Sequence, residues 1–322
     1  MLPTHQHGGQ LKLASERYQI PLGQWVDLST GINPHSYPLP RVPDYIWQRL
    51  PEVNDGLEDV AAEYYGSKHL LPVSGSQEAI QRLPLLRNKS RVGIISPAYH
   101  SHRQAWETAG HEVIEIQRPF LAKTLPSLDV LLLVNPTNPT AERYSLNELR
   151  QWHSILQTKK GWLVVDEAFI DLTPEASLIS QEPLEGLIVL RSIGKFFGLA
   201  GIRLGFVWAM PDILLSLVQL QDDWSVSNPA RWAGKIALGD TAWQLQQRHE
   251  IPENMLELKR FLSDRYNAPL AEAGLFAYVI LEKGKAIEEH QRLCQKGILT
   301  RLFSESGALR FGLPSSMDAL SF

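Results

Sequence analysis

The sequence predicts an α/β protein built on a largely parallel sheet. Two observations predict it. Short apolar runs, several of them rich in Val and Ile, recur at residues 92–96, 130–134, 162–166 and 187–192, and helical tracts lie between them. Such runs are typical of buried strands, and strands that alternate with helices favour parallel pairing, because each helix returns the chain to the same edge of the sheet.

Length and composition limit the class of protein. The 322 residues suffice for about two domains, since a domain is usually about 100–200 residues long. The formal net charge is −4 with no long basic run, so we expect a small-molecule partner and neither a nucleic acid nor a membrane. The single cysteine, Cys294, excludes an internal disulfide, and neither a secretory signal nor a run of eighteen apolar residues occurs. We expect a cytoplasmic protein.

An acid and a lysine follow two of the predicted strands. The run at 162–166 ends in Asp166, which places a carboxylate at the sheet edge where α/β proteins bind ligands. The run at 187–192 opens into Ile-Gly-Lys. A lysine after a buried strand is partly desolvated, which favours its neutral, nucleophilic amine. Lys195 is therefore a candidate for attachment of an aldehyde.

The same region supplies groups for a phosphate. Arg203 follows Lys195 by eight residues, beside two glycines, and a guanidinium fork suits a phosphate. The groups together match the needs of pyridoxal phosphate: an acid for the ring nitrogen, a lysine for the aldehyde, and Ser192 with Arg203 for the phosphate. A P-loop ATPase and a β-lactamase-like enzyme are disfavoured, because neither the Walker A motif nor the S-D-N and K-T-G motifs occur.

Three motifs carry a family resemblance: Asp-Glu-Ala-Phe at 166–169, Ser-Ile-Gly-Lys at 192–195 and Gly-Ile-Arg at 201–203. In order and spacing they resemble the core motifs of fold-type I pyridoxal-phosphate enzymes, the aspartate aminotransferase-like family. The resemblance implies pyridoxal 5'-phosphate as cofactor, and a large domain at 36–225 with a mainly parallel, seven-stranded sheet between helices. It also implies a small C-terminal α/β domain at 226–322, to which an N-terminal arm at 1–35 contributes.

The N-terminal segment narrows the resemblance. His-Gly-Gly at 7–9 is followed by Asp-Leu-Ser-Thr-Gly-Ile-Asn-Pro at 27–34, a strand entering a turn whose amides and asparagine can bind substrate oxygens. This combination resembles the opening of the threonine-phosphate decarboxylases of cobalamin biosynthesis, close relatives of histidinol-phosphate aminotransferase. The resemblance implies substrate-binding roles for His7, Gly8, Gly31 and Asn33.

A Ser-Gly-Ser turn precedes the helical tract that begins near Glu78. Small residues at a helix start leave backbone amides aimed at an anion, although such a turn is also a common helix cap. The resemblance assigns the turn to the cofactor phosphate, through Gly75, Ser76 and Gln77.

Two later segments match positions that contact the cofactor ring. After the strand at 92–96, the resemblance puts His102 where a ring stacks on the cofactor, with Tyr99 as the second choice. A metal is not expected there, because no third ligand stands at a suitable spacing. Asn-Pro-Thr-Asn-Pro-Thr at 135–140 resembles the motif whose second asparagine, here Asn138, bonds the phenolic oxygen.

Two positions depart from the aminotransferase pattern. Leu50 stands before a proline where histidinol-phosphate aminotransferases have a tyrosine that reaches the neighbouring subunit's cofactor phosphate. Phe169 stands where a tyrosine often shares the phenolic oxygen, and loss of that hydroxyl makes the phenolate more basic. Both departures favour the decarboxylase branch.

Two arginines near the C-terminus are candidates for binding the substrate. Arg310 lies in the predicted strand Ala-Leu-Arg-Phe-Gly, and an arginine between apolar strand residues is costly to bury without an anion. The resemblance places the substrate carboxylate on Arg310. Arg301 assists with the carboxylate or the substrate phosphate; the alternative is an ordinary exposed arginine at a strand end.

The reaction implied is decarboxylation of L-threonine O-3-phosphate to (R)-1-amino-2-propanol O-2-phosphate, with Asp166 stabilising the cofactor ring and Lys195 as proton donor. The bond that breaks is the one held perpendicular to the ring. A carboxylate held in the ring plane would instead expose the α-hydrogen and lead to transamination. The alternatives are an aminotransferase of the histidinol-phosphate type and a non-catalytic cofactor-binding module, whose DNA-binding segment is not visible. Family enzymes are homodimers, so a homodimer is expected.

Overall fold

The computed structural model describes residues 8–320, in two compact units. The larger unit is Ser36–Leu245, and the smaller combines the described residues up to His35 with those from Gln246 onward. The division after the N-terminal segment falls at residue 35, but the second division differs from the expected one after residue 225. Residues 226–245 belong to the larger unit because helix α10 (Asn228–Gly239) packs against helix α3 (Leu57–Tyr65).

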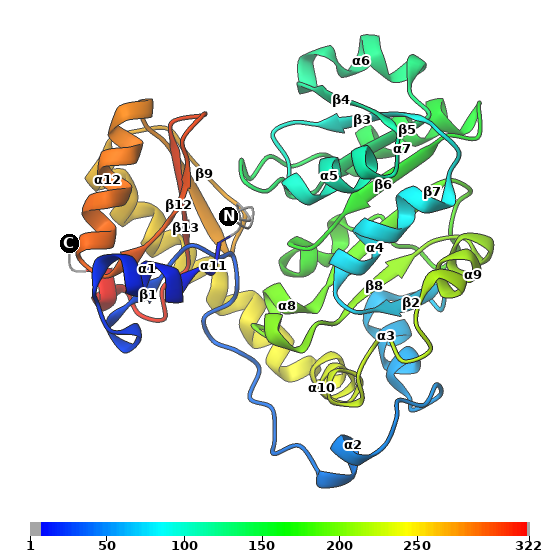
Figure 1. Ribbon diagram of the computed structural model, residues 1–322, viewed down its shortest axis with the longest axis horizontal. Helices are drawn as coiled ribbons and strands as arrows, with labels where there is room; N and C mark the ends of the chain where they lie inside the picture. Colours follow the sequence, from blue (N-terminus) through cyan, green and yellow to red (C-terminus); the bar gives the residue numbers. More distant parts are fainter. Residues whose placement is uncertain (1–7, 321–322) are drawn as a thin grey trace. The chain divides into compact units, whose positions relative to one another are not determined.

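The larger unit contains a seven-stranded sheet in the order β2-β8-β7-β6-β5-β3-β4 (Figure 1). Only β8 runs against its neighbours β7 and β2; the remaining pairs are parallel, which confirms the predicted mainly parallel sheet. The strands are β2 (Leu70–Val73), β3 (Arg91–Ile95), β4 (Glu112–Ile116), β5 (Val130–Val134), β6 (Trp162–Asp166), β7 (Leu187–Ser192) and β8 (Gly205–Trp208).

Alternate residues of the central strands point to opposite faces of this sheet, as the two-residue period of a strand requires. In β5, Val130 and Leu132 enter one apolar cluster, whereas Leu131 and Leu133 enter another. Helices cover both faces, so these strands read as continuous apolar runs. The helices are α2 (Asp44–Gln48), α3, α4 (Ser76–Arg82), α5 (His100–Thr108), α6 (Leu121–Thr124), α7 (Leu146–Gln157), α8 (Ile193–Phe196), α9 (Pro211–Leu220) and α10.

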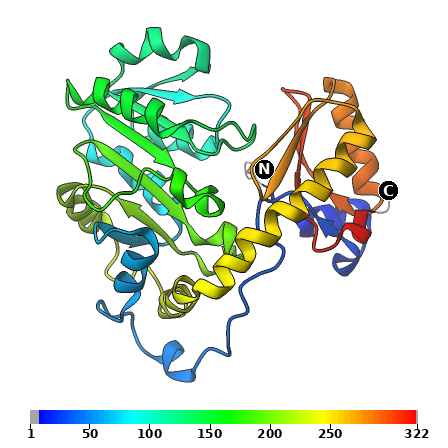
Figure 2. The ribbon, with the colours of Figure 1, turned by 180° about the vertical axis from the view of Figure 1, so that it is seen from behind.

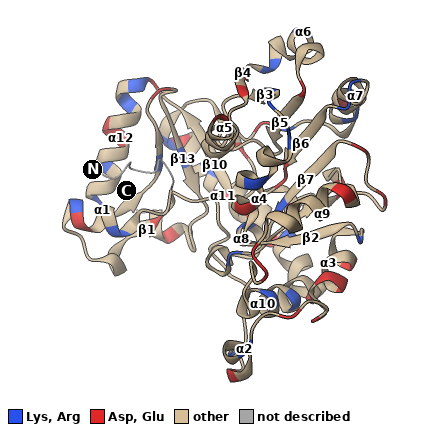
Figure 3. Cartoon of the chain, turned by 45° about the vertical axis from the view of Figure 1, so that its right-hand side comes forward, with Lys and Arg blue, Asp and Glu red and all other residues tan. Residues whose placement is uncertain are grey.

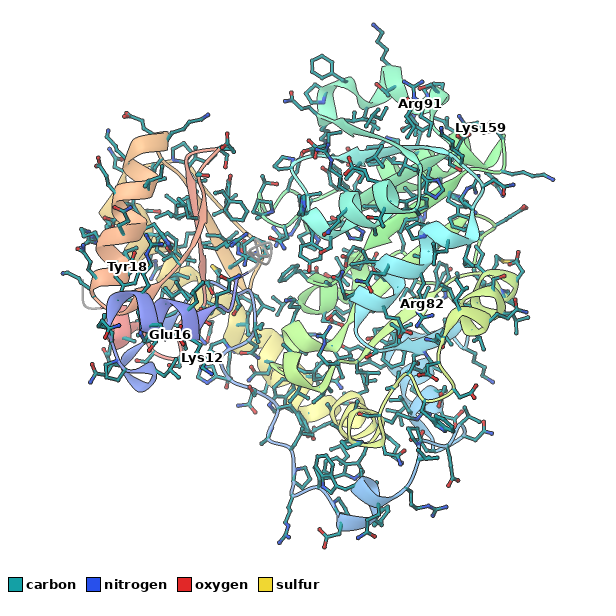
Figure 4. All side chains as sticks on the ribbon, in the orientation of Figure 1. Lys12, Glu16, Tyr18, Arg82, Arg91 and Lys159 are labelled. Atoms are coloured by element: carbon teal, nitrogen blue, oxygen red, sulfur yellow. The ribbon has the colours of Figure 1, made fainter. Side chains whose placement is uncertain are left out.

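Local signals fix where these helices begin. Helix α7 starts with a capping box, in which the Ser145 hydroxyl accepts from the Glu148 amide and the Glu148 carboxylate accepts from the Ser145 amide. Helix α4 follows Gly75 and ends at Arg82 (Figure 4). The Arg82 guanidinium pairs with the Glu78 carboxylate one turn earlier. All the charged side chains of α3 are acidic: Glu58, Asp59 and Glu63 (Figure 3).

The smaller unit has a four-stranded antiparallel sheet in the order β12-β13-β10-β9 and a parallel pair, β1 with β11 (Figure 2). Its elements are α1 (Leu11–Tyr18), β1 (Val26–Asp27), β9 (Leu270–Glu272), β10 (Phe276–Ile280), α12 (Lys283–Gln295), β11 (Ile298–Leu299), β12 (Arg301–Phe303) and β13 (Ala308–Gly312). Helix α11 (Thr241–Tyr266) contains the division between the units.

Helix α1 shows how the smaller unit is covered. Its Lys12 and Glu16 are exposed, whereas Tyr18 is half-buried with its ring 6.0 Å from that of Trp25 (Figure 4). Within residues 8–320, no helix is both long and apolar enough to cross a membrane.

Candidate active site

The ends of parallel strands in the larger unit carry the polar residues predicted from sequence. Asp166 is the last residue of β6 and is 4% exposed. One carboxylate oxygen, Oδ2, accepts a hydrogen bond from His102 Nε2 at 2.9 Å, and the other accepts from the Ala168 amide at 3.1 Å. The acid is thus held in one orientation at the edge where α/β proteins bind ligands.

His102 lies differently from its expected position. Its side chain is 1% exposed, on the first turn of α5, and its Nε2 is bonded to Asp166. An imidazole covered by protein on its faces cannot stack on a ligand ring, so its contact is with the acid. Tyr99 is half-buried one turn earlier and remains the candidate for stacking; its hydroxyl donates to Gln77 Oε1 at 3.1 Å.

Lys195 lies in the short helix α8, directly after β7, and is half-buried. Its Nζ lies over the ring of Phe169, 5.7 Å from the ring centroid. Ser192, the last residue of β7, is half-buried as well. The lysine and the hydroxyl therefore leave the sheet beside the strand that ends in Asp166, since β6 and β7 pair in parallel.

The residues expected from the sequence to bind a phosphate form a close backbone arrangement. A Cβ on Gly205 would lie 2.6 Å from the Arg191 carbonyl oxygen and 2.7 Å from the Ser76 amide nitrogen, so only glycine fits there. Gly75 has φ +69°, and a Cβ on it would lie 2.6 Å from the Arg203 guanidinium. Arg203 itself has φ +57°, which L-residues adopt rarely, and its Nη1 donates to the Ala200 carbonyl. Strained backbone, glycines and a guanidinium in contact fit a bound phosphate.

A braced loop presents Asn138. Its anchor is Asn135, whose side chain both donates to the Tyr144 carbonyl and accepts from the Tyr144 amide. The Thr137 amide also bonds the Glu142 carbonyl, which closes the loop. Asn138 directly follows Thr137 in this loop and is half-buried. Such bracing fixes the direction of its amide, as a hydrogen bond to a cofactor oxygen requires.

A buried ionic network includes Glu167 and Arg191, the chain neighbours of Asp166 and Ser192. Arg191 is 2% exposed; its guanidinium donates to Asp171 Oδ1 and to the Ser177 hydroxyl, and lies 3.5 Å from Glu167 Oε2. Its charge also lies over the Tyr65 ring, 4.6 Å from the centroid. Burial raises the pKa of Glu167, although Arg191 and two hydrogen bonds lower it. Burial lowers the pKa of Arg191, but the neighbouring Asp171 carboxylate raises it, and the pKa is raised on balance.

In the smaller unit, two arginines face each other across a strand pair. Arg301 of β12 is directly opposite Arg310 of β13 in the antiparallel register. Burial, and then the charge of Arg301, lower the pKa of Arg310 to about 10, with Asp27 opposing. Arg310 donates to the Ser29 carbonyl oxygen at 2.8 Å. Like charges opposite each other destabilise a sheet, so this pair favours a bound anion.

The N-terminal segment packs tightly beside these arginines. A Cβ on Gly8 would overlap the Ser29 carbonyl, and one on Gly312 would overlap the Thr30 carbonyl, so the backbone at 29–30 fits between two glycines. Asn33 is 1% exposed; it donates to Gln247 Oε1 and accepts from the His35 amide. Gly31 is buried, and His7 lies outside the described residues.

The segment that carries Leu50 is exposed. Helix α2 and the turn after it expose four large apolar side chains, Tyr45 (58%), Trp47 (64%), Leu50 (63%) and Val53 (77%), which we call the α2 patch. Between residues 8 and 320, no three His, Cys, Asp or Glu side chains are grouped so that they could hold a metal ion.

Comparison with known proteins decides the family. The model for "Aminotransferase class I and II" matches residues 50–319. The chain belongs to the class I and II aminotransferases. It is 46% identical to the threonine-phosphate decarboxylase of Pseudomonas aeruginosa, over 98% of this chain and 94% of that protein. This membership confirms the resemblance inferred from the motifs.

Solved structures of class I and II aminotransferase-like enzymes show the same fold. The histidinol-phosphate aminotransferase of Sinorhizobium meliloti, in complex with pyridoxal-5'-phosphate, superimposes with a TM-score of 0.82 at 18% identity, over 96% of this chain and 91% of that chain. The L-threonine-O-3-phosphate decarboxylase of Porphyromonas gingivalis superimposes with a TM-score of 0.76 at 18% identity, over 91% and 95%. The predicted fold class is confirmed.

Sequence reasoning missed two features of this aminotransferase-like site. One is the bond between His102 and Asp166, which joins residues sixty-four positions apart. The other is the network around Arg191, treated only as part of a strand. A charged residue inside the apolar run Leu-Ile-Val-Leu-Arg-Ser was the available signal, because a buried arginine needs acidic partners.

Proposed function

We propose that this chain is a threonine-phosphate decarboxylase, which converts L-threonine O-3-phosphate to (R)-1-amino-2-propanol O-2-phosphate and carbon dioxide in cobalamin biosynthesis. The observation that carries the proposal is the 46% identity to the Pseudomonas aeruginosa enzyme over nearly the whole of both chains. The two opposed arginines support it, since the substrate has both a carboxylate and a phosphate.

The cofactor is pyridoxal 5'-phosphate, and the residues of the larger unit fit it. Asp166, oriented by His102, would accept a hydrogen bond from its protonated ring nitrogen, and Asn138 would donate to its phenolic oxygen. Lys195 would hold its aldehyde, and Tyr99 would lie on its ring. The phosphate would be bound by Gly75, Ser76, Gln77, Ser192 and Arg203. When bound, the cofactor supplies a sink for the electron pair released at the substrate α-carbon.

The smaller unit would bind the substrate. Arg310 is assigned to the carboxylate, because its charge is buried and the residue opposite it on the neighbouring strand is Arg301, another cation. Arg301, half-buried, would assist with the carboxylate or the phosphate. The proposed substrate contacts are completed by groups of His7, Gly8, Gly31 and Asn33. The Asn33 side chain also stabilises the turn, through its hydrogen bonds with Gln247 and the His35 amide.

Decarboxylation breaks the bond between the α-carbon and the carboxylate carbon, and carbon dioxide leaves without its electron pair. A proton then takes that place on the α-carbon. Lys195 Nζ is the proposed donor, and it is reprotonated from water, so the reaction consumes one proton per carbon dioxide released. Arg301 and Arg310 would determine whether decarboxylation or transamination follows, because they set the direction of the substrate carboxylate.

A homodimer and a cytoplasmic location complete the proposal. The exposed α2 patch supports the dimer, because large apolar side chains gathered on a surface usually mark a contact site.

The test is release of carbon dioxide from L-threonine O-3-phosphate by the protein loaded with pyridoxal phosphate, without any keto acid. Repeated turnover that disappears in Lys195→Ala is the expected result. No release, with amino transfer once 2-oxoglutarate is added, would instead identify an aminotransferase of the histidinol-phosphate type.

A further inference from the structure

Ser29 is bonded both to the N-terminal glycines and to the buried arginine that is proposed to bind the substrate. Its carbonyl oxygen accepts a hydrogen bond from Arg310 Nη2 at 2.8 Å, across 281 positions of the chain. Its hydroxyl oxygen accepts from the Gly9 amide, also at 2.8 Å. All three residues belong to the smaller unit, and Ser29 is 2% exposed. One buried residue therefore joins two parts of the proposed substrate site.

Asp27 fixes the direction of the Ser29 hydroxyl. The hydroxyl donates its proton to Asp27 Oδ1 at 2.6 Å, and the Ser29 amide donates to the same oxygen at 2.9 Å. Because a hydroxyl has a single proton, its oxygen can only accept from any further partner. The Ser29 hydroxyl is therefore held as an acceptor for the Gly9 amide.

Gly8 packs against the same peptide group of Ser29. A Cβ on Gly8 would lie 2.2 Å from the Ser29 carbonyl oxygen and 3.3 Å from its hydroxyl oxygen. This carbonyl oxygen is the one that accepts from Arg310. A single peptide group thus sets the position of the N-terminal glycines and the direction of the arginine.

The two parts differ in what else holds them. Arg310 lies in strand β13, which pairs with β10 and β12, whereas Gly8 and Gly9 precede helix α1 and belong to no helix or strand. Groups that are ordered before a ligand arrives lower the free-energy cost of binding it. When only a fraction of the molecules has the site assembled, the apparent affinity falls by that fraction. The bond from Gly9 to Ser29 therefore bears directly on substrate affinity.

We propose that Ser29 is a positioning residue for substrate binding, whose hydroxyl holds Gly8 and Gly9 against the peptide group that orients Arg310. This inference rests on the proposed function and deepens it, because it names the residue that brings two proposed substrate contacts together. Ser29 acts through these groups and does not touch the substrate. Asp27 acts through Ser29, by fixing the proton of its hydroxyl.

The first test measures this bond in the full chain and needs no substrate. Hydrogen exchange of the Gly9 amide, resolved by fragmentation of the N-terminal peptide in a mass spectrometer, should be about fivefold or more faster in Ser29→Ala, because the amide loses its acceptor. Ser15→Ala is the matched control: it removes a hydroxyl that donates to the Ile20 carbonyl in the same unit and should leave the exchange rate unchanged. Equal exchange rates in Ser29→Ala and the wild type would overturn the proposal.

The second test is steady-state decarboxylation of L-threonine O-3-phosphate by the loaded enzyme. Ser29→Ala should raise KM about threefold to thirtyfold and leave kcat within about twofold of the wild type, because the hydroxyl acts on binding and not on the chemical step. An unchanged KM, or a lower kcat at unchanged KM, would contradict the positioning role. If Ser29→Ala does not fold, Ser29→Cys, whose sulfur is a weaker acceptor, takes its place and should raise KM in the same direction.

A double-mutant cycle separates this role from a general loss of structure. Gly8→Ala adds a Cβ that would overlap the Ser29 carbonyl oxygen, so it should displace the same segment and also raise KM. If Ser29 acts through this segment, Ser29→Ala should raise KM by a smaller factor in the Gly8→Ala background than in the wild type. Equal factors in both backgrounds would overturn the proposal. A wild-type enzyme that releases no carbon dioxide would refute the proposed function, whereas the exchange test would still decide whether Ser29 holds the glycines.

Discussion

His102 Nε2 lies 2.9 Å from Asp166 Oδ2, with both side chains buried. The acid accepts, so the imidazole carries its proton on Nε2. This bond joins the first turn of α5 to the end of β6 and fixes the carboxylate toward the proposed cofactor nitrogen. It predicts that His102 influences the cofactor through Asp166.

We expect His102→Ala to weaken pyridoxal-phosphate binding about tenfold to a hundredfold, because a hydrogen bond to a buried charge is worth about 1.5–3 kcal/mol. His102→Gln keeps a donor and should lose less. His153→Gln, at another buried histidine, is the control. Affinity is measured by fluorescence titration of the cofactor-free chain. Equal affinity of wild type and His102→Ala would contradict the role.

Arg310 is expected to serve substrate binding at the expense of stability. Arg310→Met should lower kcat/KM about a hundredfold or more, because the substrate carboxylate would be bound without its cationic partner. Without substrate, the same variant should be more stable by about 1–4 kcal/mol, because the charge is buried next to Arg301. Steady-state kinetics and urea unfolding measure the two effects. A variant that is both inactive and less stable would argue that Arg310 is structural.

The same arginine predicts a pH effect. Its pKa in the folded chain is lowered to about 10 from an ordinary value of 12.5, so its charge is complete well below pH 10 and is lost as the pH rises through that value. Substrate binding should therefore weaken above about pH 10, as a rise in KM. A KM that stays constant there would show that the arginine remains charged.

Arg191 should be essential for stability. Arg191→Met leaves the carboxylates of Glu167 and Asp171 buried without their cation, which costs about 3–5 kcal/mol. Replacing all three with Met, Gln and Asn removes the charges together and should recover much of that loss. Urea unfolding of the single and triple variants tests this, and equal stability of the two variants would be the contrary result.

The α2 patch should lie in the dimer contact. Trp47→Glu places a charge in it and is expected to shift the protein toward a monomer in light scattering. Leu215→Glu introduces the same charge at a residue that is 65% exposed on α9 and should leave the dimer intact. A dimer that tolerates both substitutions would move the contact elsewhere.

The sequence was sufficient to predict the mainly parallel sheet and the residues at which its central strands end. The runs that end in Asp166 and Ser192 are buried strands at the predicted positions, because a strand covered on both faces must be apolar throughout. The hydrogen bond between His102 and Asp166 could not be predicted from the sequence, because it depends on how α5 packs against β6. The division at 245 was also missed, because the packing of α10 on α3 is a tertiary contact between amphipathic helices.

The insertion of residues 29–30 between Gly8 and Gly312, with β1 paired to β11, determines when the smaller unit can form. Val26 bonds the Gly297 carbonyl, and Gly312 bonds the Leu28 carbonyl. These partners are separated by the entire larger unit. During synthesis the N-terminal segment must therefore wait until the ribosome has released residues beyond 312, while Ser36–Leu245 is already continuous and free to fold. Arg301 and Arg310, which are proposed to bind the substrate, therefore lie in the last part of the chain to be assembled.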